Sequence, residues 1–111
     1  MAGILRGEIR WANLDPAVGQ EQSGRRPVLI ISRNTFNEYS ATVIGMAITS
    51  REPKAGFPFT LELKSIELPR KSWVKISQVR ILSVMRIGRL IGRISDEDLA
   101  QVIEGLNEII A

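Results

Sequence analysis

A chain of 111 residues, 44% of them hydrophobic and 24% charged, is long enough for one buried core and too short for two, so a single domain over residues 1–111 is expected. It contains no cysteine and no histidine, which excludes disulfides, Cys/His zinc sites and every catalytic centre that needs a thiolate or an imidazole. All 15 Lys and Arg but only seven acids fall within residues 1–94, a net charge of +8 that points to a polyanionic partner, nucleic acid first, with a solvated basic surface as the alternative.

The first predicted element is a half-buried strand over residues 8–14, followed by a long loop. In this strand Ile9 and Trp11 alternate with polar or small residues. The strand ends at Asp15-Pro16, because proline lacks the N–H that a sheet ladder needs. The loop over residues 15–25 is eleven residues long, above the usual length of a connection, and loops of this length in compact domains are commonly functional.

Two β-rich segments follow, joined by a polar connection. Residues 28–32 are apolar on both faces, as expected of a central strand. Residues 41–50 form a second β-rich run that ends in two hydroxyl residues. The segment between them, residues 33–40, is a polar connection.

The next part of the chain predicts short strands and leaves one segment open. Residues 57–63 alternate apolar and polar side chains, and Pro58 near the start indicates an edge strand or strand entry. A basic connection over residues 64–72 leads to a short strand at 73–76. Residues 77–94 suit a short helical turn followed by a strand as well as they suit two strands.

The end of the chain predicts an amphipathic helix over residues 95–110, which follows a strand-rich body over residues 1–94. Ser95 and Asp98 have the spacing of a capping box, and the acids of the first turn suit the helix dipole. One helix face carries Leu99, Val102, Ile103, Leu106, Ile109 and Ile110. A helix of this kind packs on a sheet, so the predicted fold class is α+β, with a strongly curved antiparallel sheet that forms a small, partly open barrel. No export leader or membrane-length apolar run is seen, so a cytoplasmic protein is expected.

A set of ordered motifs resembles the MazF/PemK/Kid family of toxin endoribonucleases. In the first third of the chain these are Gly7-Glu8, Trp11, Leu14-Asp15-Pro16, Gly19, Glu21-Gln22, Gly24 and Arg26-Pro27-Val28. Further on, the matching elements are "AITS" at 47–50, "GFPF" at 56–59 and Gln78-Val79-Arg80. The first third is specific, because its fixed Gly, Pro and charged residues keep their order over some twenty positions. Some relatives carry a histidine immediately before the arginine, where this chain has Arg25.

The resemblance implies a fold, an activity and two partners. The fold is an SH3-like barrel that forms a homodimer. The activity is cleavage of single-stranded RNA at short sequence motifs, without a metal or other cofactor. The ribose 2′-OH attacks the adjacent phosphate and leaves a 2′,3′-cyclic phosphate and a 5′-OH. A cognate antitoxin of the MazE type, with an acidic C-terminal segment, keeps the toxin inactive, and no membrane is involved.

The same resemblance assigns site residues, and their chemistry suits the reaction in part. Arg26 and Thr49 carry over as catalytic residues, since a guanidinium matches two phosphate oxygens and a hydroxyl can bond a third. Glu21 is assigned as a third catalytic residue, either as the general base or as an orienter of the arginines, because arginine stays protonated and histidine is missing. The substrate-binding set is Arg25, Ser50, Gln78, Gln22 and Asp15.

Each of these residues also has a purely structural interpretation. Arg26 could simply flank a strand, Thr49 is a common β-former at a strand end, and Glu21 could form a loop ion pair. Trp11 could stack a base, but a single Trp in an alternating strand is more often part of a core, and the same holds for Trp73. Three further arginines either follow the RNA backbone or solvate a face: Arg86, Arg89 and Arg93.

Two other classes of function compete with RNA cleavage. A CcdB-like toxin has the same kind of barrel and poisons DNA gyrase by binding, and the combination of Glu21, Arg26 and Thr49 counts against it. A non-catalytic barrel would bind single-stranded RNA without cutting it. Purified protein on naked RNA separates all three.

Overall fold

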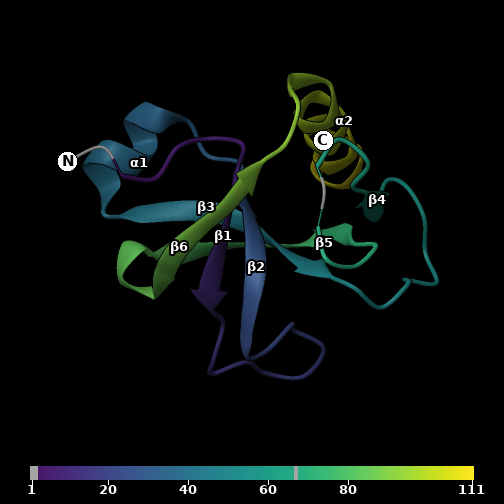
Figure 1. The fold of residues 1–111 in the computed structure, drawn as a ribbon, viewed down its shortest axis with the longest axis horizontal. Helices are drawn as coiled ribbons and strands as arrows, with labels where there is room; N and C mark the ends of the chain where they lie inside the picture. Colours follow the sequence, from purple (N-terminus) through teal and green to yellow (C-terminus); the bar gives the residue numbers. More distant parts are fainter. Residues whose placement is uncertain (1–2, 67) are drawn as a thin grey trace.

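The computed structural model describes residues 3–66 and 68–111, and within them it forms one six-stranded antiparallel sheet and two α-helices. The strands are β1 (Glu8–Asn13), β2 (Arg25–Ile30), β3 (Thr42–Thr49), β4 (Thr60–Glu62), β5 (Trp73–Ser83) and β6 (Ile87–Arg93). The helices are α1 (Asn34–Ser40) and α2 (Asp96–Ile110), and a 3₁₀ turn spans Val84–Arg86. In the order β4-β5-β3-β2-β1-β6 the two edge strands do not pair, so the predicted α+β class with a partly open antiparallel barrel is confirmed (Figure 1).

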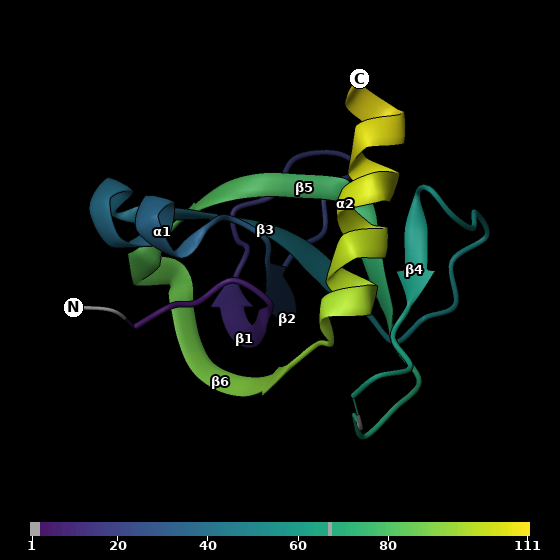
Figure 2. The same cartoon turned by 90° about the horizontal axis from the view of Figure 1, so that it is seen from above.

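The sheet is strongly curved, and irregular pairing accounts for the bending. Register shifts interrupt the β1–β6 pair on either side of Arg10, and another shift lies between Met46 and Ile48 in the β3–β5 pair. Extra residues of this kind bend a strand and increase its twist. β6 therefore curves around β1, and helix α2 follows the end of β6 in the chain (Figure 2).

Two apolar clusters lie on the two faces of the curved sheet. Because side chains alternate along a strand, Leu29 and Val28 of β2 point into different clusters. The larger cluster lies between the sheet and α2 and includes Ile9, Leu29, Met46, Ile76 and Val102. The smaller one includes Ala12, Leu14, Val28, Val43 and Leu82. Packing on the larger cluster fixes the position of α2, since burial of one such side chain contributes about 1.5–3 kcal/mol.

The start of α2 has the predicted cap. The Ser95 hydroxyl accepts a hydrogen bond from the Asp98 backbone N–H at 3.1 Å. The reciprocal bond of a capping box is replaced by Ser65, whose hydroxyl accepts from the Ser95 N–H and donates to the Asp98 carboxylate. The cap therefore also ties α2 to the connection between β4 and β5.

The polar connection over residues 33–40 contains a helix that was not predicted from the sequence, since Asn34–Ser40 forms α1 between β2 and β3. Asn37 is its buried residue, and its side-chain amide donates to the backbone carbonyls of Ile4 and Ser32. Ala41 ends the helix in a left-handed conformation with a φ of 57°. A seven-residue helix anchored by one amide has no apolar stripe, so the 3.6-residue period that reveals longer helices is missing.

Three predicted strand boundaries also change. β2 begins at Arg25 rather than after Pro27 and ends at Ile30, so both arginines belong to the strand. β4 covers only Thr60–Glu62 instead of residues 57–63, and Phe57 and Phe59 precede it half-exposed. β5 extends to Ser83, so the segment left open contains the end of one strand, a helical turn and a second strand.

The predicted apolar face of α2 is longer than the surface that it covers. Val102 is fully buried, and Leu99, Ile103 and Leu106 pack against the same cluster. Ile109 and Ile110 are instead 38% and 69% exposed, because the end of α2 extends past the sheet (Figure 2). The expectation that the whole apolar face packs on the sheet is therefore wrong for these two residues.

Gly105 leaves no room for a side chain where α2 meets β5. A Cβ at this position would lie 2.8 Å from Ile76 Cδ1, 3.0 Å from Phe57 Cε1 and 3.1 Å from the Pro58 carbonyl oxygen. Alanine gains about 1 kcal/mol of helix propensity, and such overpacking costs about 1–3 kcal/mol. We therefore expect Gly105→Ala to lower the free energy of unfolding in urea by about 1 kcal/mol, while the exposed Gln101→Ala changes it by less than about 0.5 kcal/mol. A Gly105→Ala variant more stable than the wild type would contradict this.

Candidate functional site

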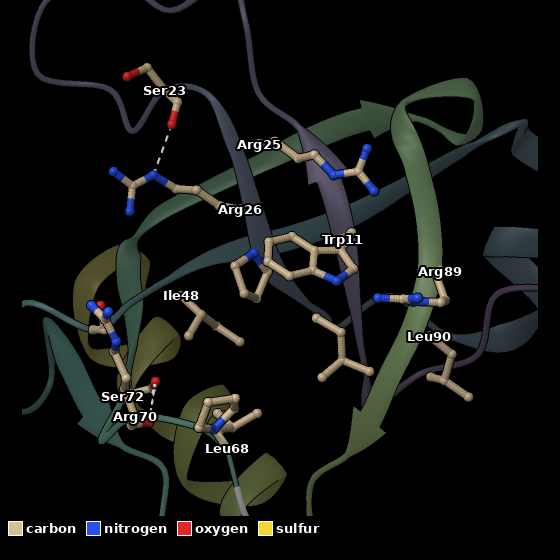
Figure 3. A pocket seen from close by; sticks show the side chains of 14 residues that line it. Trp11, Ser23, Arg25, Arg26, Ile48, Leu68, Arg70, Ser72, Arg89 and Leu90 are labelled. Carbon is tan, nitrogen blue, oxygen red and sulfur yellow. Dashed lines mark hydrogen bonds between the residues drawn. The ribbon is translucent and has the colours of Figure 1, made fainter.

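A groove of about 700 Å³ lies on the sheet face that also carries Ile9 and Leu29, beyond the part that α2 covers (Figure 3). Its floor is apolar. Trp11 of β1 is paired with Pro27 of β2, and Ile48 of β3 lies beside them in the groove. Leu68, Leu90 and Ile91 complete the apolar wall. The neighbouring strands β6, β1, β2 and β3 thus bring residues from distant parts of the sequence to one surface.

Four arginines surround this apolar floor. Arg25 and Arg26 come from the start of β2, Arg70 from the connection before β5, and Arg89 from β6. Among the described residues that line the groove none is acidic, and the described chain holds no cluster of three or more metal-binding side chains. Like charges around a groove with an apolar floor focus the electrostatic potential. The groove is therefore suited to a polyanion with apolar or aromatic parts.

Arg26 is half-buried and held at a fixed place on the rim. Arg26 pairs with Ala12 in the β1–β2 ladder, and its Nε donates to the Ser23 carbonyl at 2.8 Å. Within the described residues its two terminal nitrogens have no protein partner. One edge of the guanidinium is thus anchored while its end remains available for two oxygens of a phosphate.

Arg25 is exposed and lies over the indole of Trp11, with its guanidinium carbon 5.6 Å from the ring centroid. This is a cation–π contact, and at an exposed position such a contact contributes about 0.5–1 kcal/mol. Arg25 lines the groove, its predicted role in substrate binding stays a prediction, and its partner in this structure is an aromatic ring.

The two hydroxyl residues at the end of β3 have different surroundings. Ser50 is exposed and lines the groove together with Ile48. Thr49 lies between them in sequence, is 9% exposed and is not part of the lining, and its Oγ1 accepts from the Arg51 N–H at 3.1 Å. Its hydroxyl proton is not used by that bond. The structure thus places Ser50 in the groove and Thr49 beside it, facing away.

Asp15 and Glu21 organise the long loop instead of lining the groove. The Asp15 carboxylate accepts from the Gly24 N–H at 2.9 Å, which closes the base of the loop. The Glu21 carboxylate accepts from the Val18 N–H at 2.7 Å, which closes a turn at its tip. The predicted contact of Glu21 with the arginines is not among the interactions of the described residues.

Gln78 and Gln22 fasten this loop to the sheet. The Gln78 side chain, on β5, accepts from the Gln22 N–H at 3.2 Å and donates to the Gln20 carbonyl at 3.3 Å. Neither glutamine lines the groove. Their common role in this structure is to hold the loop that precedes Arg25 and Arg26.

The arginines of the last strand region separate into three roles. Arg89 lines the groove. Arg86 donates to the backbone carbonyls of Asn13 and Asp15 and so supports the start of the long loop. Arg93 lies 3.5 Å from the buried Glu8 carboxylate at the opposite end of β1.

Sequence reasoning did not include several groove residues in the predicted site. Trp11 is half-buried with its ring on the groove, whereas Trp73 is 9% exposed. Arg70 and Ser72 come from the basic connection before β5, whose charge was the available signal. Arg89 was one of three arginines expected either to follow the RNA backbone or to solvate a face, and no local pattern distinguishes it from the other two.

The fold and this site define a class: a small, open β-barrel with a cationic groove that suits an anionic polymer. The model of the PemK-like, MazF-like toxins of type II toxin–antitoxin systems matches residues 5–110. The chain belongs to this family. In the described residues no helix is both long and apolar enough to cross a membrane.

Solved structures agree with this assignment. MazF from Deinococcus radiodurans is 28% identical, with 96% of both chains covered and a TM-score of 0.85. A MazE–MazF complex from the same organism contains a chain 28% identical, with 96% of this chain and 95% of that chain covered and a TM-score of 0.77. A mycobacterial endoribonuclease in complex with its cognate antitoxin is 20% identical over 96% and 93% of the chains, with a TM-score of 0.77, and supports the fold alone.

Proposed function

We propose that this toxin is a sequence-specific endoribonuclease that cleaves single-stranded RNA in the cytoplasm. The observation that carries the proposal is the groove, in which an anchored Arg26 and three other arginines surround an apolar, partly aromatic floor. The arginines suit the phosphates of a strand, and the floor suits bases that are not paired. Membership of the PemK-like, MazF-like toxin family supports the same activity.

The cleavage step needs no group beyond RNA and protein. The ribose 2′-oxygen forms a bond to the adjacent phosphorus while the bond from phosphorus to the 5′-oxygen breaks. The 2′-OH loses its proton to a base, the leaving 5′-oxygen gains one, and the ends are a 2′,3′-cyclic phosphate and a 5′-OH. Arg26 stabilises the charge that develops on the phosphoryl oxygens, and the exposed Ser50 hydroxyl, which lines the groove, supplies a further donor after the end of β3.

Glu21 acts in this scheme as the residue that shapes the loop, because its carboxylate already closes a turn with the Val18 N–H. Glutamine keeps an acceptor for that bond and cannot take up a proton. We expect Glu21→Gln to retain cleavage within about twofold, and Glu21→Ala to lose about fivefold, the value of one hydrogen bond of about 1 kcal/mol. Rates on a defined RNA strand measure this. A Glu21→Gln variant as slow as one lacking Arg26 would make Glu21 the general base instead.

The partners of the site follow from its charge. An acidic segment of a cognate antitoxin competes with RNA for the cationic groove, and two neighbouring structures are toxin–antitoxin complexes. The toxin acts as a homodimer. Gyrase binding and RNA binding without cleavage are the alternatives that the following experiment separates.

The test is incubation of purified protein with a long single-stranded RNA in EDTA, followed by mapping of fragment ends. Discrete cuts with 5′-OH ends are expected, together with complete resistance of a strand that carries 2′-deoxyribose at the mapped cut. Intact RNA would overturn the proposal, and binding without cuts would leave the non-catalytic alternative. Cuts at the 2′-deoxy position would overturn the mechanism.

A further inference from the structure

The groove contains an aromatic ring that the cleavage chemistry does not use. Trp11 lies on its floor beside Pro27 and Ile48, while the phosphate chemistry is assigned to Arg26 and the Ser50 hydroxyl. The Trp11 residue is half-buried, so the β1–β2 ladder fixes it while part of the ring remains accessible. Figure 3 shows the indole between Arg25 and the apolar wall.

Arg25 covers the indole in the protein without RNA. Its guanidinium carbon is 5.6 Å from the ring centroid, and the residue is exposed. Gly88 of β6 lies close to this pair, since a Cβ there would be 3.5 Å from the Trp11 carbonyl oxygen, 3.7 Å from Trp11 Cβ and 3.9 Å from Arg25 Nη2. Because Arg25 is exposed, its side chain can leave the ring toward solvent without disturbing the strands, and it then loses one exposed cation–π contact.

We propose that Trp11 is the base-stacking residue of the groove and that Arg25 is a displaceable cover. The base of a nucleotide next to the phosphate held by Arg26 stacks on the indole, and Arg25 moves from the ring to the RNA backbone. The groove supports this adjacency, because Trp11 and Arg26 line the same cavity. Stacking on an aromatic ring is stronger than an exposed cation–π contact, so the exchange favours the bound strand.

This inference rests on the proposed function for its ligand, a single-stranded nucleic acid. Trp73 provides an internal control for it. Trp73 also has a cation over its ring, with Lys71 Nζ 5.8 Å from the centroid, but it is 9% exposed and is not part of the groove lining. A Trp73→Phe variant leaves Trp11 as the sole tryptophan and should leave cleavage unchanged.

The test uses a short 2′-O-methyl RNA, which binds but cannot be cut through its 2′-oxygen, so the readout does not depend on activity. In Trp73→Phe protein we expect this strand to quench tryptophan emission. An abasic strand of equal length and charge should bind through the arginines without that quenching. Equal quenching by both strands would overturn the proposal, because it would report movement of Arg25 alone. No quenching by either strand would also overturn it.

Affinity supplies the second measurement. We expect Trp11→Leu to weaken binding of the 2′-O-methyl strand by about 5- to 100-fold and to leave binding of the abasic strand unchanged. Trp11→Phe should retain affinity within about threefold, since it keeps an aromatic face. Equal losses in Leu and Phe variants, or equal losses for both strands, would show a merely structural role.

The two proposals fail in different ways. Stacking on Trp11 without any cleavage of RNA would remove the enzymatic proposal and leave Trp11 in a binding module. Cleavage with the same strand affinity in the Trp11→Leu protein would leave the enzyme and remove the stacking role.

Discussion

Arg26→Ala is expected to cleave single-stranded RNA about 10²- to 10³-fold more slowly than the wild-type protein. Loss of one donor that stabilises transition-state charge has this cost in other enzymes. The expectation depends on geometry, because Arg26 lines the groove and is anchored through Nε by the Ser23 carbonyl at 2.8 Å. Initial rates of cleavage at saturating RNA measure the effect, since the loss should appear in kcat.

Two variants make this result specific. Arg26→Lys keeps the charge and loses both the planar fork and the Nε anchor, so it should fall between alanine and the wild type. Arg33→Ala removes an exposed arginine outside the groove and should cleave at the wild-type rate. An Arg26→Ala rate within threefold of the wild type would exclude Arg26 from the chemistry.

The fold was predictable wherever apolar residues repeat along the chain. The alternation around Ile9, the apolar run of β2 and the period of Leu99 and Val102 in α2 each indicated the correct element. Helix α1 was missed because one buried amide, Asn37, anchors it in place of an apolar stripe. Short elements held by single polar contacts leave no period to detect.

The candidate site was predictable only for residues in the long loop and at the starts and ends of strands. Arg25, Arg26 and Ser50 line the groove, and their roles in RNA cleavage stay predictions. Arg70 and Arg89 reach the same groove from segments far along the chain, so their placement depends on the strand order and on the curvature of β6. A local sequence pattern predicts neither the strand order nor the curvature of β6.

Arg70 and Arg89 provide a prediction that tests the groove as a surface. If the four arginines each contact one phosphate of a single strand, the slope of log affinity against log salt is about −0.7 per contact, or about −2.8 in total. Affinity of the wild type for an uncleavable strand should then fall about 50-fold between 50 mM and 200 mM salt. The fall in affinity of each variant over the same salt range is compared with this wild-type value.

We expect the double variant Arg70→Gln/Arg89→Gln to bind more weakly at low salt and to lose only about sevenfold over the same salt range, because two phosphate contacts remain. The control is Arg33→Gln/Lys64→Gln, which removes the same charge from two exposed residues that do not line the groove. It should keep the wild-type slope, since a change in net charge alone does not release counterions from phosphates. A double variant with the wild-type slope would mean that RNA contacts only the β2 side of the groove, at Arg25 and Arg26. Equal slopes in the double variant and its control, both below the wild type, would mean that overall charge rather than the groove attracts RNA.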